Sequence, residues 1–258
     1  MKRIRRAISV TILVAGVLVV TALAVVWTAP GWLIPRLARR YPGCLYQVPT
    51  HEKIVALTID DGPDPVSTPA ILDQLRRYSA RTTFFIITSR LPGQSALMQR
   101  LVRDGHQLGN HFTRDRASIR LSRQEFEADL LAAHGALSPW GHPVWARPGS
   151  GWYSEEMVAV MRQYLYRCAL GSVYPLDTAI PSVTWATQYI LHHVRPGAII
   201  ILHDGGTRGK RTARTLAAVL PELRKGGYQV VTLSELMRSQ TPVARNRDRA
   251  GWFPGHHR

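Results

Sequence analysis

The sequence predicts an α/β fold, a distorted (β/α) barrel of about seven or eight units that follows one transmembrane helix. Three observations support this fold class. Strand-like and helix-like stretches alternate after residue 53, polar residues follow several of the strand-like stretches, and a long uncharged run lies near the N-terminus. A doubly wound parallel sheet is the alternative arrangement for the same alternation.

The N-terminal segment has the charge pattern of a membrane anchor. Residues 1–6 carry four basic side chains, and residues 7–27 form a run of 21 residues without a charge. As a helix this run would be about 32 Å long, which matches the thickness of a bilayer core. The pattern favours a single-pass signal anchor with a basic cytoplasmic start and an extracytoplasmic remainder. Cleavage near Ala22-Leu23-Ala24 and secretion is the alternative.

The rest of the chain divides into three expected parts. Residues 28–52 contain four prolines and are expected to form a juxtamembrane connector near lipid headgroups. Residues 53–237 are expected to form the folded domain. Residues 238–258 are rich in arginine and are expected to be a disordered basic tail.

Within residues 53–237, short apolar runs predict strands and longer amphipathic runs predict helices. The expected strands are 54–59, 83–88, 106–109, 144–146, 165–170, 198–202 and 229–233. The expected helices are 68–78, 96–104, 123–137, 155–164, 185–194 and 212–225. Ser122 with Glu125 forms a capping-box pattern, Ser154 is a second N-cap, and Gly226 follows the last long helix.

Composition limits the classes of partner. The net charge is +16, and much of it lies in the two terminal segments. The remaining basic residues are scattered without an RNA-binding or zinc-finger signature, so we expect an anionic membrane or wall surface and no nucleic acid as partner. The two cysteines, Cys44 and Cys168, allow one long-range disulfide without predicting it.

Polar residues recur where predicted strands end. Asp60-Asp61 follows the first strand, Asn110-His111 the third, Arg147 the fourth and His203-Asp204 the sixth. In a barrel these positions share the face on which active sites are assembled. Paired carboxylates with histidine and a further acid at Asp115 offer ligands for one divalent metal ion and leave one carboxylate as a base. The chain has no GxSxG, P-loop or GxGxxG motif, so this inventory is typical of a metal-dependent hydrolase.

Four motifs carry a family resemblance. They are Thr58-Ile59-Asp60-Asp61-Gly62-Pro63, Gly109-Asn110-His111, Arg147-Pro148 and Leu202-His203-Asp204. In this order they resemble the polysaccharide deacetylases of carbohydrate esterase family four, the NodB homology domain, over roughly residues 53–237. The resemblance implies a distorted (β/α) barrel and a metal-dependent hydrolase. This hydrolase would remove N-acetyl groups from an N-acetylglucosamine-containing glycan such as peptidoglycan or chitin.

The resemblance also implies roles for single residues. Asp60 matches the general base, and Asp61 and His111 match metal ligands. Arg147 matches the group that orients the base, and His203 matches the general acid that protonates the departing amine. A fourth motif is matched loosely around Asp177, which would tune the catalytic histidine.

One position departs from the family pattern. The family's second metal-binding histidine is replaced here by Asp115, in His111-Phe112-Thr113-Arg114-Asp115. Asp115 is expected to be the third ligand of one divalent ion, and the resemblance implies that this ion is zinc. The second carboxylate would shift the metal preference of the site toward manganese or cobalt. The alternative is that Asp115 pairs with a nearby arginine and leaves the metal site incomplete.

Two aromatic residues bear on the substrate. Trp152 and Tyr153 lie in a glycine-rich turn after Arg147 and are expected to contact sugar rings, whereas Trp145, inside a strand, is expected in the core. The sequence leaves two other functions open. One is hydrolysis of another amide or ester, such as an O-acetylated glycan, and the other is sugar binding by a protein with an impaired metal site.

Overall fold

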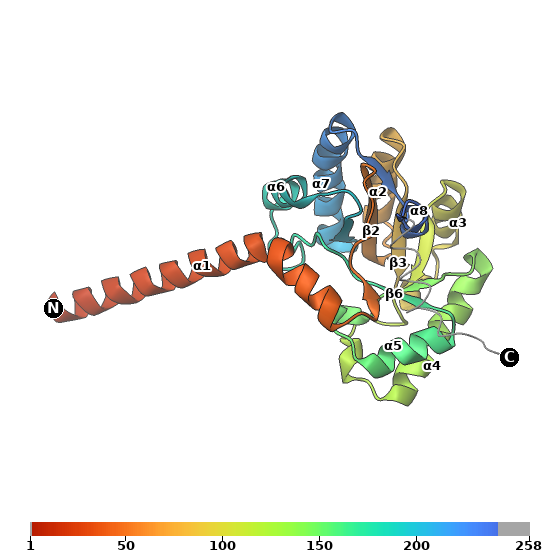
Figure 1. Cartoon of the computed structure of the whole chain (residues 1–258), viewed down its shortest axis with the longest axis horizontal. Coiled ribbons are helices and arrows are strands. Elements are labelled where there is room, and N and C mark those ends of the chain that lie inside the picture. Colours follow the sequence, from red (N-terminus) through yellow and green to blue (C-terminus); the bar gives the residue numbers. More distant parts are fainter. Residues whose placement is uncertain (1, 242–258) are drawn as a thin grey trace. The chain divides into compact units, whose positions relative to one another are not determined.

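A computed structural model describes residues 2–241, and Figure 1 shows its elements. The chain divides into two units, residues 1–40 and residues 41–258. The first unit is one helix, α1 (Lys2–Arg40). Its segment Thr11–Thr28 is long and apolar enough to cross a membrane by length and composition, as a signal sequence also can be. The helix continues through Arg40, so half of the expected connector is helical.

The second unit contains a sheet of parallel strands. Its strands are β1 (Cys44–Leu45), β2 (Ile54–Gly62), β3 (Thr82–Ile86), β4 (Gln107–Asn110), β5 (Trp145–Ala146), β6 (Arg167–Ala169), β7 (Ile199–His203) and β8 (Gln229–Val231). Their order is β1-β6-β5-β4-β3-β2-β7, and β8 pairs with the start of β2. Single bridges from Gln47 to Ala198 and from Val173 to Ile200 connect the two ends of the sheet. The sheet is therefore curled into a distorted barrel, which confirms the predicted fold class.

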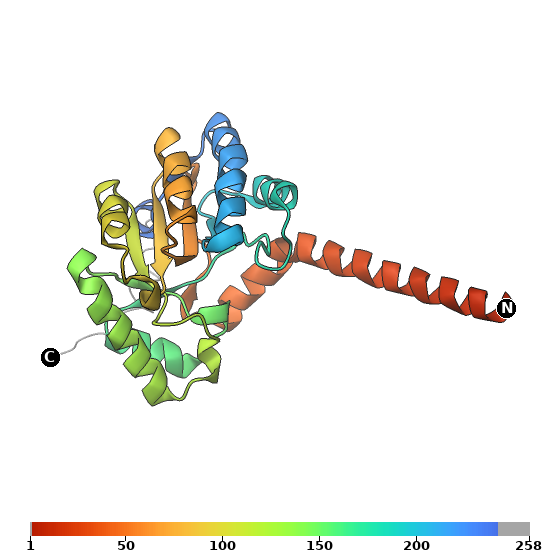
Figure 2. The ribbon, with the colours of Figure 1, turned by 180° about the vertical axis from the view of Figure 1, so that it is seen from behind.

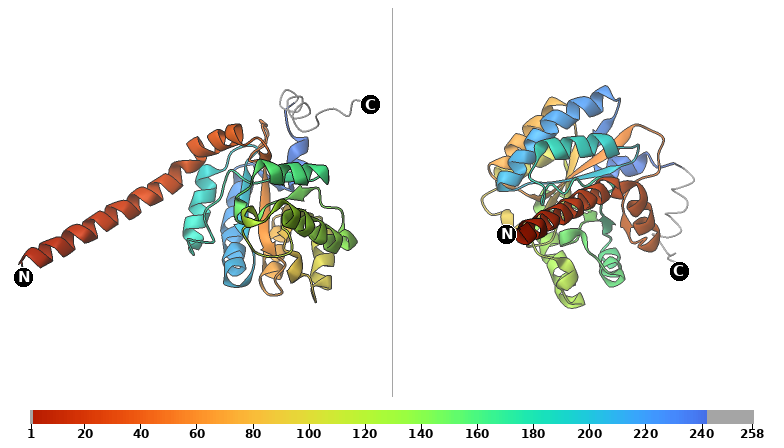
Figure 3. Two further views of the ribbon diagram at one scale, coloured as in Figure 1. Left: turned by 90° about the horizontal axis from the view of Figure 1, so that it is seen from below. Right: turned by 90° about the vertical axis from the view of Figure 1, so that its left-hand side faces the viewer.

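Helices surround this sheet. They are α2 (Ser67–Arg77), α3 (Ser95–Arg103), α4 (Arg123–Leu137), α5 (Glu155–Gln163), α6 (Val183–His193), α7 (Gly206–Lys225) and α8 (Leu233–Arg238). Figure 2 shows α7 between α2 and α6, and the three helices pack together. In Figure 3 the green helices α4 and α5 lie on the other side of the strands. Helices therefore cover the strands on more than one side, as expected for a parallel sheet.

Local capping patterns in the sequence correctly predicted where several helices begin. Ser122 and Glu125 form both hydrogen bonds of the capping box at the start of α4, and Ser154 accepts a hydrogen bond from Met157 N at the start of α5. By contrast, α7 begins at Gly206 rather than at residue 212. Its first turn packs so closely that a Cβ atom at Gly209 would lie 2.3 Å from both Asp204 Oδ1 and Ser67 Oγ. Because Gly206 and Gly209 have low helix propensity, the local sequence did not predict this first turn.

The elements β1 and α8 were not predicted. β1 has only two residues, too few for any periodicity, and it belongs to the part of the chain expected to be a connector. It pairs with β6 so that Cys44 is opposite Cys168, and these two cysteines form a disulfide bond. The structure thus answers the question that the cysteine spacing left open.

β2 is the central strand of the domain. All nine of its residues are buried; β3 and β7 pair along its two edges, and Ile54 and Ala56 pack in the core cluster with side chains of other strands. Trp145 is buried in the core, as expected. The register places Asp60 of β2 opposite His203 of β7 and Phe85 of β3. The carboxyl ends of these strands therefore meet at one place, and several of the predicted site residues lie there.

Candidate active site

Asp60 is the centre of a buried network of side chains. Arg147 Nη1 lies 2.5 Å from Asp60 Oδ1, and the same nitrogen donates to Thr58 Oγ1 at 2.9 Å. The other carboxylate oxygen, Asp60 Oδ2, lies 4.0 Å from the Nε2 atoms of both His111 and His203. One oxygen is thus held by a cation, while the other faces two imidazoles.

Arg147 is itself fixed from several sides. Its Nε donates to Ala169 O at 2.8 Å, its Nη2 donates to Leu170 O at 3.0 Å, and its guanidinium carbon lies 4.1 Å from the centre of the Phe85 ring. The side chain is almost completely buried, and burial lowers the pKa of its guanidinium against the effect of Asp60. This cation has little freedom to leave the carboxylate that it orients.

His203 is oriented by Asp177. His203 Nδ1 lies 2.9 Å from Asp177 Oδ1, and the backbone N–H of His203 donates to Asp177 Oδ2 at 3.0 Å. With the Nδ1 proton facing Asp177, Nε2 is the nitrogen that faces Asp60. Burial lowers the pKa of His203, but the hydrogen bond and charge of Asp177, together with Asp60, outweigh it and raise the pKa above its ordinary value.

His111 and Asp61 form the other half of the site. His111 Nδ1 lies 2.6 Å from Arg147 O, so the ring donates its Nδ1 proton to that carbonyl and turns Nε2 toward Asp61 Oδ1, 3.5 Å away. Asp61 has a left-handed φ of 70° at an irregularity of β2 between Asp60 and Gly62, and its carboxylate faces the same His111 Nε2 atom as Asp60 Oδ2 does. Burial raises the pKa of Asp61, but the hydrogen bond and charges of its neighbours, with His111 first, lower it to about 2.

Two arginines hold Asp61, and neither was predicted from the sequence. Arg208 Nη1 lies 3.0 Å from Asp61 Oδ2, and Arg90 donates to the backbone carbonyl of Asp61. Arg208 lies in the first turn of α7, which begins before the helix expected from the sequence. Arg90 lies in the short helix η1 (Thr88–Arg90) after β3. Neither residue belongs to a motif or a periodic pattern, so only the folded chain brings them to the site.

The structure does not bring Asp115 to Asp61 and His111. Its carboxylate is 59% exposed and pairs with Arg90 Nη2 at 3.6 Å. Pairing of Asp115 with a nearby arginine was one of the two expectations from the sequence. The partner is Arg90, which lies in the connection after β3, and not Arg114, Arg116 or Arg120. Within residues 2–241, no group of three or more His, Cys, Asp or Glu side chains is arranged to hold a metal ion.

The residues present fit a divalent ion in part. Asp61 Oδ1 and His111 Nε2 are a carboxylate oxygen and an imidazole nitrogen, and their 3.5 Å separation suits two neighbouring ligands of one ion at the usual bond length of about 2.1 Å. The hydrogen bond of His111 Nδ1 to a carbonyl is the outer contact that metal-binding histidines generally make. Two ligands of the expected three are therefore in place.

Trp152 and Tyr153 face different surroundings. The Trp152 side chain is 71% exposed directly after the turn η4 (Gly149–Gly151), where a sugar ring can reach it. The Tyr153 hydroxyl lies 2.8 Å from Tyr46 Oη and donates to Tyr41 O at 3.0 Å. The phenol of Tyr153 thus connects the turn to the segment before β2, so its polar end is engaged within the protein.

Asp204 is a further buried carboxylate whose role was not predicted. Ser67 Oγ donates to Asp204 Oδ1 at 2.6 Å, and Thr68 donates to Oδ2. Burial raises the pKa of Asp204, which is completely enclosed. The residue ties the end of β7 to the start of α2, and so holds the two connections that carry His203 and Asp61.

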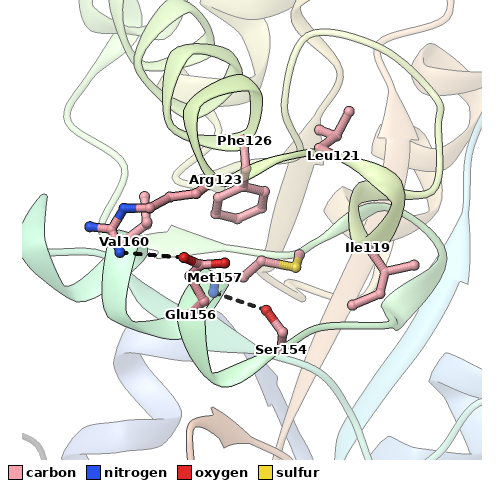
Figure 4. Close-up of a pocket in the computed structure, with 8 residues that line it drawn as sticks. All are labelled: Ile119, Leu121, Arg123, Phe126, Ser154, Glu156, Met157 and Val160. Carbon is pink, nitrogen blue, oxygen red and sulfur yellow. Dashed lines mark hydrogen bonds and ion pairs between the residues drawn. The ribbon is translucent and has the colours of Figure 1, made fainter.

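A separate pocket of about 150 Å³ lies between α4 and α5. Figure 4 shows the residues that line it, including Phe126, Met157 and the ion pair of Arg123 Nη1 with Glu156 Oε1 at 3.7 Å. None of the predicted site residues lines this pocket. It belongs to the packing of the two helices and not to the site described above.

Comparisons with known proteins agree with this geometry. The family model for polysaccharide deacetylase matches residues 47–169. A peptidoglycan-N-acetylglucosamine deacetylase of Bacillus cereus is 37% identical over 196 residues, which cover 75% of this chain and 92% of that protein. A chitooligosaccharide deacetylase of a Bradyrhizobium strain is 31% identical over 196 residues, covering 70% of this chain and 90% of that protein.

Solved structures show the same fold. A peptidoglycan N-acetylglucosamine deacetylase superposes with a TM-score of 0.73 at 25% identity, covering 80% of this chain and 96% of that one. A family 4 acetyl xylan esterase from Clostridium thermocellum, solved in complex with a cobalt ion, gives a TM-score of 0.66 at 28% identity over 72% of this chain and 91% of that one. The chain therefore belongs to the polysaccharide deacetylase family of hydrolases.

Proposed function

We propose that this enzyme removes N-acetyl groups from N-acetylglucosamine residues of a cell-wall glycan, with peptidoglycan as the first candidate. The observation that carries the proposal is the position of Asp60 Oδ2, 4.0 Å from the Nε2 atoms of both His111 and His203. A general base there lies between a metal-ligand nitrogen and a general acid, the arrangement that hydrolysis of an amide requires.

Asp60 acts as the base through one oxygen. Arg147 occupies Oδ1 and fixes the carboxylate, so Oδ2 is the atom that takes a proton from the attacking water. Because the site is buried, the ion pair with Arg147 is only weakly screened by solvent. The carboxylate is thus held in place before the substrate binds.

His203 acts as the acid. Asp177 holds its Nδ1 proton, and against the effect of burial its hydrogen bond and charge raise the pKa of the ring, which favours the protonated form that donates from Nε2 to the departing amine. The nitrogen of an amine is a poor leaving group without this proton. Asp177 is therefore a positioning residue that acts through His203.

Asp61 and His111 would hold one divalent metal ion, with zinc, manganese and cobalt as the candidates. Such an ion, when bound, lowers the pKa of a coordinated water and polarises the acetyl carbonyl. Asp115 is left out of this set, because its exposed carboxylate pairs with Arg90. Arg208 orients Asp61 by holding Oδ2 and leaving Oδ1 toward His111.

The cellular site and the substrate surface follow from features outside the catalytic centre. The apolar segment Thr11–Thr28 supports a single membrane anchor, with cleavage and secretion as the alternative. The Cys44–Cys168 disulfide supports an oxidising, extracytoplasmic compartment for the domain. Trp152 is the side chain that supports contact with a sugar ring.

The test is acetate release by the full chain in detergent after treatment with EDTA. Peptidoglycan, chitooligosaccharide and O-acetylated xylan are each supplied with zinc, manganese or cobalt added back singly, and the Asp60→Asn variant is the matched control. We expect metal-restored acetate release from peptidoglycan, and none from the control variant.

The other outcomes select the alternatives. Release from acetylated xylan alone would assign an O-acetyl esterase, the activity named for the cobalt-bound relative. Metal binding without release from any of the three glycans would remove the substrate assignment and keep the site. Absence of both metal binding and release would favour a sugar-binding protein with an impaired metal site, which the placement of Asp115 motivates.

A further inference from the structure

The backbone of β6 holds the cation that orients the catalytic base. Two of the three nitrogens of Arg147 donate to carbonyls at the end of this strand, Nε to Ala169 O at 2.8 Å and Nη2 to Leu170 O at 3.0 Å. Only Nη1 remains for Asp60 and Thr58. The direction of the guanidinium, and with it the place of Asp60 Oδ1, therefore depends on where the end of β6 lies.

The end of β6 is in turn held by β1 and the disulfide. Leu45 of β1 pairs with Ala169, Leu170 N donates to Leu45 O at 2.8 Å, and Cys44 is covalently joined to Cys168. β1 is only two residues long, and on its other side the segment after it is joined to the far end of the sheet by the Gln47–Ala198 bridge and the hydrogen bond of Val48 N to Gly197 O. A strand this short is readily lost by local opening unless a covalent bond retains it.

We infer that the Cys44–Cys168 disulfide is a positioning element for catalysis, acting through the Ala169 and Leu170 carbonyls on Arg147 and thereby on Asp60. The inference rests on the proposed function, because it needs Asp60 as the base. Its physical basis is that small misplacements of a catalytic group cost large factors in rate. A disulfide that only stabilised the fold would change the unfolding temperature and leave kcat unchanged.

The experiment removes the disulfide in two backgrounds. Alanine replaces both cysteines, Cys44→Ala with Cys168→Ala, because the two side chains are buried among apolar neighbours. In the otherwise unchanged full chain we expect kcat to fall about tenfold while KM stays the same. In an Arg147→Lys background, which already lacks the two-carbonyl contact, we expect the same pair of changes to lower kcat less than about twofold.

Two further measurements separate positioning from stability. Leu223→Ala, on the buried face near the end of α7, is the control for stability, and it should lower the unfolding temperature and keep kcat. The Arg147 Nε–H signal in a nitrogen–proton NMR spectrum reports the hydrogen bond to Ala169 O and requires no substrate or catalysis. The signal is assigned by its absence in the Arg147→Lys variant. We expect slow exchange of this proton with water in the parent chain and faster exchange without the disulfide.

The outcomes are distinct. An equal loss of kcat in both backgrounds, or an unchanged Arg147 Nε–H signal, would overturn the inference. No acetate release by the parent chain from any glycan would refute the proposed function instead, and the NMR signal would then decide whether the disulfide still positions Arg147.

Discussion

The two halves of the site differ in how completely the fold holds them. In the proposed acid–base half, Asp60, Arg147 and Asp177 are buried, His203 is nearly so, and the four side chains contact one another in a continuous network. In the metal half, Asp61 and His111 are buried, but Asp115 is exposed and paired with Arg90.

The difference follows from the supporting backbone. Asp60 and His203 are opposite each other in the sheet register, and Arg147 directly follows a strand. Asp115 lies in the loop after β4, where no strand pairing fixes its side chain. Residues at strand ends are thus placed by the sheet. Asp177 and Asp115 both lie in loops, and each pairs with the side chain that it meets there, Asp177 with His203 inside the site and Asp115 with Arg90 at the surface.

The strongest test of the acid–base half is Asp60→Asn. The amide cannot accept the proton from water at Oδ2, so we expect kcat to fall about a thousandfold with little change in KM. Acetate release under saturating substrate measures this loss. Asp73→Asn, a change at an exposed carboxylate of α2, should keep the parent rate. A parent-like rate for Asp60→Asn would show that another group is the base.

The metal half is tested by comparing Asp61→Asn with Asp115→Asn. Loss of a ligand carboxylate should weaken binding of zinc or manganese by about a hundredfold or more in Asp61→Asn. Because Asp115 is exposed and paired with Arg90, its variant should change the dissociation constant by less than about threefold. Calorimetric titration of the metal-free protein measures both. Equal losses would mean that Asp115 enters the site when metal binds.

The pH dependence tests the link between Asp177 and His203. Asp177 raises the pKa of His203, so the imidazole keeps its proton to higher pH than an ordinary histidine. In Asp177→Asn the pKa falls, the proton is lost at lower pH, and the alkaline limb of kcat moves toward acid. Activity at pH 8 should drop about tenfold while the acid limb stays in place. Asp177→Glu is the conservative control, and an unmoved alkaline limb would contradict the assignment.

The smallest effects are expected at the two aromatic residues. Trp152→Ala should raise KM for long glycans about fivefold with kcat unchanged, since an exposed indole contributes only binding. Tyr153→Phe should leave KM unchanged and lower stability by about 1 kcal/mol, since it loses the bonds to Tyr46 and Tyr41. Kinetics and thermal unfolding of both variants separate the roles. A KM change in Tyr153→Phe would assign it to the substrate surface.

The sequence by itself determined the fold class and most strand positions. Apolar runs and caps are local, so the extent of α4 and the buried strand at residues 54–59 could be predicted from neighbouring residues alone. The motifs at strand ends predicted which polar residues share one face, because parallel strands bring their carboxyl ends together. Asp60, Arg147 and His203 were found in this way.

Only the tertiary structure decided the contacts between distant segments. Three contacts join parts of the chain that no periodic pattern relates. They are the Cys44–Cys168 disulfide, the ion pair of Asp115 with Arg90 and the ion pair of Arg208 with Asp61. The first turn of α7 likewise packs against a distant segment, because Gly209 lies too close to Ser67 to leave room for a side chain. The physical reason is that these contacts are set by packing and charge in three dimensions, whereas local propensity and periodicity report only on neighbours along the chain.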